Sequence, residues 1–269
     1  MNKATKLFYK ITNIKPYRSY KIKDGITNIN YKIFTDKGVF VMRIPRKDIV
    51  GINFKRQDKV LKLVKDSNID VIYYNSDTGV MISKFINVNK NKKVSFDVVV
   101  KHLKKLHSIN QTDIADFDPF NLINTYKQIV NKSLFINEEK VIEKAKKIYE
   151  RYPRVLCHND VLYANFLLSK DKDYLIDYEY AGGNIALFDV VSFLSENNID
   201  DESLKLSFIN KYFDKVDDTL LDDINTMFMF LDILWGYWAN AMYLKYKEEV
   251  FYDIAIEKLN RYNLKNDNS

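Results

Sequence analysis

The chain has 269 residues, of which 46% are hydrophobic and 29% are charged, the balance of a folded globular protein and not of a disordered one. Its formal net charge is +6, but the lysines are spread along the whole chain without an arginine-rich tract, so a solvated surface is expected and nucleic acid is not an expected partner. One cysteine, Cys157, excludes an internal disulfide framework and any cysteine-based zinc site.

No segment of the sequence resembles a signal peptide or a membrane span. Residues 1–10 are polar and lack an apolar core. The longest apolar stretch, 227–234, is interrupted by Asp232 and is far too short to cross a bilayer. We therefore expect a cytoplasmic protein with no membrane partner.

The first third of the chain is typical of a β-rich domain. Alternating or β-branched patterns predict short strands at residues 20–23, 30–35, 39–44, 71–74 and 80–83. Turn residues at Asp24-Gly25 and at Asp36-Lys37-Gly38 separate the first three strands. A helix is predicted over 53–66, where apolar residues share one helical face.

After residue 87 the pattern becomes helical. Apolar residues recur at helical spacing over 98–109, 120–131 and 138–152. A short strand-like interruption follows over 155–177, and the remainder is again helical. These patterns predict an α+β fold of two domains, a small β-rich one at 1–87 and a larger, mostly helical one at 88–269. A cleft between two such domains would be the natural place for a ligand.

The strand-like interruption contains a polar loop and an apolar hairpin. His158-Asn159-Asp160 opens the loop, and Asn165 follows five residues after Asp160. The hairpin then leads to Ile176-Asp177-Tyr178-Glu179-Tyr180, which returns Asp177 to the neighbourhood of the loop. The Asp-Asn spacing alone is weak, because these residues can also cap turns, but the complete combination is specific.

Phosphoryl transfer from ATP needs this set of groups. One carboxylate, here Asp160, must orient the attacking hydroxyl and accept its proton. A carbonyl oxygen and a second carboxylate, here Asn165 and Asp177, must hold magnesium on the phosphates. Hard oxygen ligands suit magnesium, and the scarcity of histidine and cysteine argues against zinc. His107, at the end of a predicted helix, is interpreted as forming a structural hydrogen bond.

The run from His158 to Asn165, followed by the run from Ile176 to Tyr180, closely resembles the choline/ethanolamine kinases. It is most similar to their bacterial LicA-type members, within the larger aminoglycoside-phosphotransferase and protein-kinase-like group. The resemblance covers most of the chain. It implies a two-lobed protein-kinase-like fold and an ATP- and magnesium-dependent kinase.

The resemblance also implies residue roles in this loop. Asp160 would be the catalytic base, and Asn165 and Asp177 would be the magnesium ligands. His158 would be a structural member of the loop. Asp189, in Leu187-Phe188-Asp189-Val190, matches an aspartate with which the family braces the same loop.

Residues 24–31 resemble the family's turn over the nucleotide phosphates. Gly25 permits a tight turn, while Thr27, Asn28 and backbone N–H groups can face phosphate oxygens. Taken alone, this segment is an ordinary hairpin. By the same resemblance, backbone groups of Ser83 to Phe85 would bond the adenine base.

Arg43 lies on the third predicted strand, where protein kinases carry lysine and choline kinases carry arginine. A guanidinium can clamp two phosphate oxygens, although a surface arginine is the alternative. The following helix usually supplies a glutamate to pair with this cation, but here the stretch reads Lys55-Arg56-Gln57-Asp58-Lys59. Either Asp58 substitutes through a shift of register or Gln57 gives a neutral contact.

The two tryptophans of the chain, Trp235 and Trp238, are three residues apart and share a helix face. Aromatic faces bind quaternary ammonium groups, although core packing is the commoner role of such a pair. The resemblance favours a role of the pair in binding the acceptor, because choline kinases carry this pair together with residues that match Tyr180 and Glu196. An aminoglycoside would require several carboxylates instead.

We therefore expect a choline kinase that forms phosphocholine, with ATP and a small amino alcohol as its partners. Ethanolamine, thiamine or an aminoglycoside are alternative acceptors, and a homodimer is compatible with the sequence. The alternative to an enzyme is a pseudokinase, which binds nucleotide without catalysing transfer. It would be marked by the loss of Asp160, Asn165 or Asp177, and all three are present.

Overall fold

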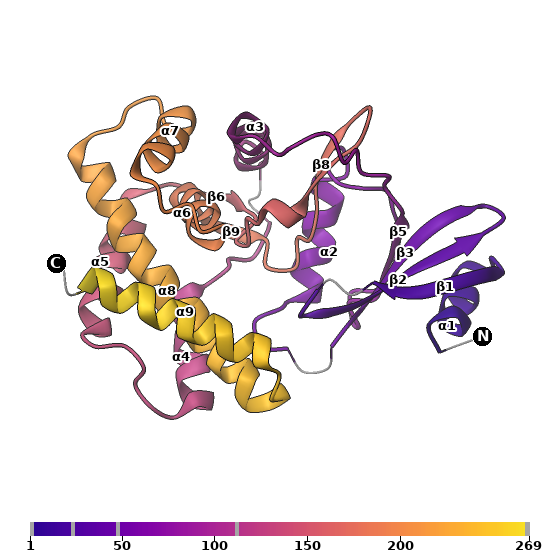
Figure 1. Ribbon diagram of the computed structural model, residues 1–269, viewed down its shortest axis with the longest axis horizontal. Helices are drawn as coiled ribbons and strands as arrows, with labels where there is room; N and C mark the ends of the chain where they lie inside the picture. The colour runs from indigo at the N-terminus through magenta and orange to yellow at the C-terminus, as the bar shows by residue number, and fades with distance from the viewer. Residues whose placement is uncertain (1–2, 23–24, 47–48, 111–112, 267–269) are drawn as a thin grey trace. The chain divides into compact units, whose positions relative to one another are not determined.

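The computed structural model describes residues 3–22, 25–46, 49–110 and 113–266 (Figure 1). Lys23 and Asp24, which belong to a predicted strand and turn, lie outside the described residues. Contacts divide the chain into two units, Met1–His102 with Ala164–Ala181 and Leu103–Tyr163 with Gly182–Ser269. These units interleave along the chain, whereas the domains expected at 1–87 and 88–269 are continuous, and that expected division stays a prediction.

The first unit is built on a five-stranded antiparallel sheet (Figure 1). In the spatial order β1-β2-β3-β5-β4, its strands are β1 (Pro16–Ile22), β2 (Asn28–Thr35), β3 (Gly38–Pro45), β5 (Met81–Lys84) and β4 (Val71–Tyr74). Side chains on one face of the sheet meet helix α1 (Lys3–Thr12) in an apolar core. The buried members of this core are Phe8, Ile33, Phe40, Met42 and Ile82.

A helix and a hairpin complete the first unit. Helix α2 (Phe54–Leu63) begins after Asn53, whose side chain accepts a backbone N–H of the first turn at 3.0 Å and so caps the helix. The hairpin pairs β7 (Phe166–Leu168) with β8 (Asp173–Leu175). Because this hairpin belongs to the first unit, it brings residues that follow the loop at 158–165 into the unit that contains the sheet.

The second unit is mostly helical. Helix α3 (Phe96–His107) begins in the first unit and ends in the second. The other helices of the unit are α4 (Pro119–Val130), α5 (Glu138–Arg151), α6 (Ala186–Glu196), α7 (Glu202–Tyr212), α8 (Asp218–Tyr246) and α9 (Glu249–Asn266). Helix α6 is buried almost all round, because most of its residues from Leu187 to Ser195 are apolar or small.

Helices α8 and α9 lie side by side (Figure 1), and ion pairs join them at one buried carboxylate. Asp232 of α8 is fully buried. Nε of Arg261 donates to its Oδ1 at 3.0 Å, and Nζ of Lys265 lies 3.5 Å from its Oδ2. Burial still raises the pKa of Asp232 above its ordinary value, against the opposing effect of these cations. Two cations from the last helix therefore compensate one buried carboxylate of the helix before it.

A two-stranded ladder of β6 (Arg154–Cys157) and β9 (Gly182–Ile185) leads into α6. The sequence patterns missed β9, because Gly182-Gly183 is typical of a turn. The guanidinium of Arg154 occupies the space that a Cβ atom at Gly183 would fill. A side chain at this position would therefore require the Arg154 guanidinium to move aside.

The structure confirms the predicted α+β fold class, with a small sheet in one unit and helices in the other. Helix α1 was not predicted from the polar N-terminal segment. Among the described residues, no helix combines the length and apolar character required to cross a membrane.

Candidate active site

Asp160 lies in the loop that follows β6 in the second unit. The loop begins at His158 and continues to Tyr163, where a short 3₁₀ helix, η1 (Tyr163–Asn165), starts. Asn159 adopts the left-handed conformation, with φ of 66°. Such a conformation is uncommon outside glycine, so contacts around the loop must hold it.

Asp189 of α6 makes two of these contacts. It is fully buried, and it accepts the backbone N–H groups of His158 and Asn159, each at 2.7 Å. Both carboxylate oxygens of Asp189 therefore bind the loop backbone immediately before Asp160. The contact agrees in position with the bracing role implied by the resemblance, but that role in catalysis stays a prediction.

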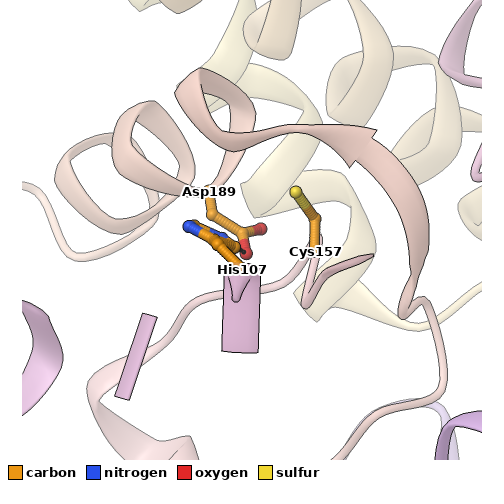
Figure 2. Close-up of side chains that lie close together, drawn as sticks. All are labelled: His107, Cys157 and Asp189. Carbon is orange, nitrogen blue, oxygen red and sulfur yellow. Dashed lines mark hydrogen bonds and ion pairs between the residues drawn. The ribbon is translucent and has the colours of Figure 1, made fainter. Parts of the chain in front are cut away.

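His107 and Tyr212 extend this brace, and Figure 2 shows His107 beside Asp189. Nε2 of His107 lies 2.9 Å from Oδ2 of Asp189, and Nδ1 lies 2.6 Å from the Tyr212 hydroxyl. Because a carboxylate only accepts, Nε2 is the donor, and a neutral ring then accepts the Tyr212 proton at Nδ1. Sequence reasoning anticipated a structural hydrogen bond for His107, but it missed Tyr212, which carries no local signal.

His107, Asp189 and Cys157 also come within reach of one another, as Figure 2 shows. One ligand atom of each lies within 4.8 Å of the others, a spacing that could hold a metal ion. The hydrogen bonds already use these atoms, and Sγ of Cys157 donates to the Ile185 carbonyl at 3.3 Å. Burial raises the pKa of the Cys157 thiol well above its ordinary value, which disfavours the thiolate that a metal requires. The group is better described as a hydrogen-bonded brace.

Asp177 belongs to a polar cluster in the first unit. Nη1 of Arg43 lies 2.5 Å from Oδ1 of Asp177 and 4.0 Å from Oε2 of Glu179. Glu179 in turn accepts the Thr27 hydroxyl and the Asn28 side-chain amide, each at 2.7 Å. This cluster therefore joins the start of β2, the middle of β3 and the segment after β8.

Glu179 is the member of this cluster that sequence reasoning left without a role, although it stands inside the motif at 176–180. Burial, and then the charge of Asp177, raise the pKa of Glu179 to about 7, while Arg43 and the bonds from Thr27 and Asn28 act in the opposite direction. The predicted phosphate-binding side chains of Thr27 and Asn28 thus contact a carboxylate directly. Gly25 precedes them with φ of 110°, which favours glycine.

Arg43 takes its partners from the segment after β8, and not from α2. Asp58 pairs with Lys62, 2.7 Å away on the same helix. The side-chain oxygen of Gln57 accepts the Tyr74 hydroxyl at 2.8 Å. Among the residues that the structure describes, the ionic partners of Arg43 are Asp177 and Glu179, so neither Asp58 nor Gln57 supplies the contact that was considered from the sequence.

The hairpin brings Asn165 close to Asp177. Asn165 ends η1 and is buried, and its carbonyl accepts the backbone N–H of Ile176 at 2.9 Å. Phe166 and Leu175 pair directly across the hairpin. An amide oxygen and a carboxylate therefore project from neighbouring backbone positions, although their role as magnesium ligands stays a prediction.

The predicted adenine-binding residues lie at the end of β5. Ser83 is fully buried and pairs with both Val41 and Val71 in the sheet. The backbone N–H of Phe85 donates to the Val39 carbonyl at 2.9 Å, so this donor is engaged within the unit. Adenine binding by this segment stays a prediction.

The tryptophan pair lies on α8 in the second unit. The rings of Trp235 and Trp238 are 6.0 Å apart and perpendicular, and both side chains are buried. Phe117 packs against Trp235, and Phe251 packs against Trp238. The structure thus brings the two indoles together within an aromatic cluster.

Glu196 has a partner that the sequence did not indicate. Nζ of Lys258 lies 2.6 Å from its Oε2, and the Ser195 hydroxyl donates to its Oε1 at 3.0 Å. The Lys258 side chain is only 3% exposed, so this ion pair is largely dry. Tyr180 belongs to the first unit, and its predicted place in the acceptor site stays a prediction.

Comparisons with known proteins point to one family. The family model for choline/ethanolamine kinase matches residues 20–263. Protein LicA of Haemophilus influenzae is 23% identical over 197 residues, and the match covers 66% of this chain but only 58% of that protein's length. A probable ethanolamine kinase of Arabidopsis thaliana is 24% identical over 268 residues, with 81% of this chain and 71% of that protein covered.

The fold comparison covers the complete chain. The crystal structure of choline kinase LicA from Streptococcus pneumoniae superposes with a TM-score of 0.83 and 20% identity, over 100% of both chains. This likeness establishes the fold, and the family model extends over nearly all of the sequence that forms it. The chain therefore belongs to the choline/ethanolamine kinase family, whose members are ATP-dependent small-molecule kinases.

Proposed function

We propose that this chain is a magnesium-dependent choline kinase, which transfers the γ-phosphate of ATP to the choline hydroxyl and releases phosphocholine and ADP. The observation that carries the proposal is the cluster of Arg43, Asp177 and Glu179 around the turn at Thr27 and Asn28. It combines a guanidinium for phosphate oxygens with carboxylates for a divalent cation, which are the two needs of nucleotide phosphate binding.

The donor set in the first unit fits magnesium. Asn165, Asp177 and Glu179 offer amide and carboxylate oxygens, the hard ligands that magnesium prefers. Among the described residues, Nε of Arg43 is a buried donor without an acceptor, which suits a phosphate oxygen. Bound magnesium would neutralise negative charge on the phosphates, while Asn165 and Asp177 would hold it and Arg43 would orient the terminal phosphoryl group.

Asp160 would act on the acceptor. Its carboxylate would accept the proton of the choline hydroxyl while the oxygen forms a bond to the γ-phosphorus. The bond from that phosphorus to the bridging oxygen of ADP would break, and ADP would keep the electron pair. Asp189 would keep the loop fixed through the backbone N–H groups just before Asp160.

The state of Glu196 favours choline over ethanolamine. A primary ammonium has three N–H donors that need acceptors, whereas a quaternary ammonium needs only aromatic faces and a diffuse negative field. The carboxylate of Glu196 already accepts from Lys258 and Ser195. The indoles of Trp235 and Trp238 would therefore carry most of the recognition, and they suit choline better.

The test is ADP release from ATP and magnesium with choline, ethanolamine, thiamine or kanamycin offered separately. We expect choline to give the highest kcat/KM, and Asp160→Ala to abolish turnover. Asp171→Ala, which removes an exposed carboxylate from the hairpin turn, is the matched control and should keep full activity. Tight ATP binding without turnover on any acceptor would refute the proposal and would favour a nucleotide-binding pseudokinase.

A further inference from the structure

Side chains of α6 hold the catalytic loop on both sides of Asp160. Before it, Asp189 accepts two backbone N–H groups. After it, the N–H of Val161 donates to the Ser192 hydroxyl at 3.2 Å, and the N–H of Tyr163 donates to Oδ1 of Asn197 at 2.7 Å. The loop backbone therefore finds its partners in one helix and in the residue that ends it.

Asn197 makes the most complete of these contacts. While its oxygen accepts from Tyr163, its Nδ2 donates to the Val161 carbonyl at 2.9 Å and to the Phe193 carbonyl at 2.7 Å. The two donors and the acceptor of the amide are thus all used. The planar amide of Asn197 therefore hydrogen-bonds to the backbone on either side of Leu162 and links it to the end of α6.

We propose that Asn197 is a positioning residue for phosphotransfer, because it fixes the backbone between Asp160 and the segment that leads to Asn165. Asn197 acts through Val161 and Tyr163, and it has no role in proton transfer. The proposal rests on the proposed function for the role of Asp160. Its structural part, that Asn197 restrains the loop, stands on the three hydrogen bonds alone.

The expected effect follows from the distance over which a loose loop can move its carboxylate. A displacement of about 1 Å at a reacting group can lower the rate about 100-fold. Asp189 would still hold the loop before Asp160 in an Asn197 variant, so a fall in kcat of roughly 10- to 100-fold is expected. KM for ATP and choline should change less than about threefold, since both donors and the acceptor of the Asn197 amide are used by backbone groups.

A matched control is available on α7. Nδ2 of Asn210 donates to the Leu206 carbonyl four residues back at 2.9 Å, just as Asn197 donates to Phe193. Asn210→Ala therefore removes the same helix contact without touching the loop. Asn197→Ala and Asn210→Ala should be compared by kcat, by KM and by amide hydrogen exchange of peptides that cover residues 158–165.

Faster exchange in that peptide together with lower kcat, in Asn197→Ala only, is the expected result. Unchanged exchange would overturn the inference that Asn197 restrains the loop. Faster exchange with unchanged kcat would overturn the role of Asn197 in positioning Asp160. If Asn197→Ala does not fold, Asn197→Asp serves instead, because it keeps the acceptor for Tyr163 and loses both donors. If the wild-type chain turned over no acceptor, the proposed function would fail, while the exchange result would still decide whether Asn197 holds the loop.

Discussion

Replacing Gln57 with glutamate would restore the residue that kinases of this group usually carry on this helix, yet here it should destabilise the protein. Gln57 is only 1% exposed, and its oxygen accepts the Tyr74 hydroxyl. The cation that would receive the new carboxylate, Arg43, already pairs with Asp177 and Glu179. Gln57→Glu therefore buries a third carboxylate, and its expected partner Arg43 already has two carboxylate partners among the described residues.

Glu179 indicates the size of the penalty. Burial and its neighbours raise the pKa of Glu179 from the ordinary 4.5 to about 7. Each pKa unit corresponds to about 1.4 kcal/mol, so a carboxylate in the same surroundings costs about 3 kcal/mol once it is ionised. For a chain of this size, that loss lowers Tm by roughly 6–12 °C.

The penalty has a defined pH dependence. A carboxyl group whose folded pKa is raised gives up stability as pH increases, because the unfolded chain ionises first, near the ordinary pKa of 4.5. The cost is therefore small at pH 5 and nearly complete at pH 7.5. Thermal unfolding of the wild type and Gln57→Glu at these two pH values should show a difference in Tm that grows by several degrees.

Gln57→Met separates charge from the lost hydrogen bond to Tyr74. It has a similar length and no ionisable group, so its Tm difference from the wild type should be the same at both pH values. A Gln57→Glu variant as stable as the wild type at pH 7.5 would refute the reasoning. It would mean that the new carboxylate pairs with Arg43, as the usual pattern of these kinases would have it.

Three further outcomes are expected. Trp238→Leu should raise KM for choline about 3- to 30-fold and leave KM for ATP unchanged, because a cation–aromatic contact contributes roughly 0.5–2 kcal/mol. An unchanged KM for choline would assign Trp238 to core packing. Lys258→Met should lower Tm and raise the ratio of kcat/KM for ethanolamine to that for choline, since it removes the nearer cation from Glu196 and leaves Arg261 at 3.9 Å. A lower Tm with an unchanged ratio would make the pair purely structural. Tyr212→Phe should lower kcat by less than about tenfold in steady-state assays, because Asp189 keeps its hydrogen bonds to the loop backbone. A complete loss of activity in folded protein would contradict a role of Tyr212 that acts only through His107 and Asp189.

Local sequence patterns predicted most of the elements because local physics determines them. The first three strands were predicted from alternating or β-branched patterns, and the predicted turn at Asp36-Lys37-Gly38 stands where the chain reverses between β2 and β3. Strand β9 could not be predicted in this way, since Gly182 and Gly183 have low strand propensity. Its conformation depends on the pairing with β6 and on the space that Arg154 fills, both of which involve residues about 30 positions away.

The motif spacing predicted which residues belong to the candidate site, but not how they pair. Asn165 and Asp177 come together because a hairpin lies between them, which the sequence indicates. The contact of Glu179 with Thr27 spans 152 positions, and the contact of Glu196 with Lys258 spans 62. Such pairs depend on tertiary packing, for which a single sequence carries no periodic signal.

The ion network on the last helix has a consequence for the order in which the chain matures. During synthesis, Asp232 leaves the ribosome well before Arg261 and Lys265, the two cations that compensate it. Until α9 follows, α8 can bury this carboxylate only by keeping it protonated, as the upward displacement of its pKa indicates. The second unit can therefore reach its final packing only after α9 has been synthesised. A premature stop upstream of Arg261 would yield a chain whose defect lies in assembly and not in chemistry.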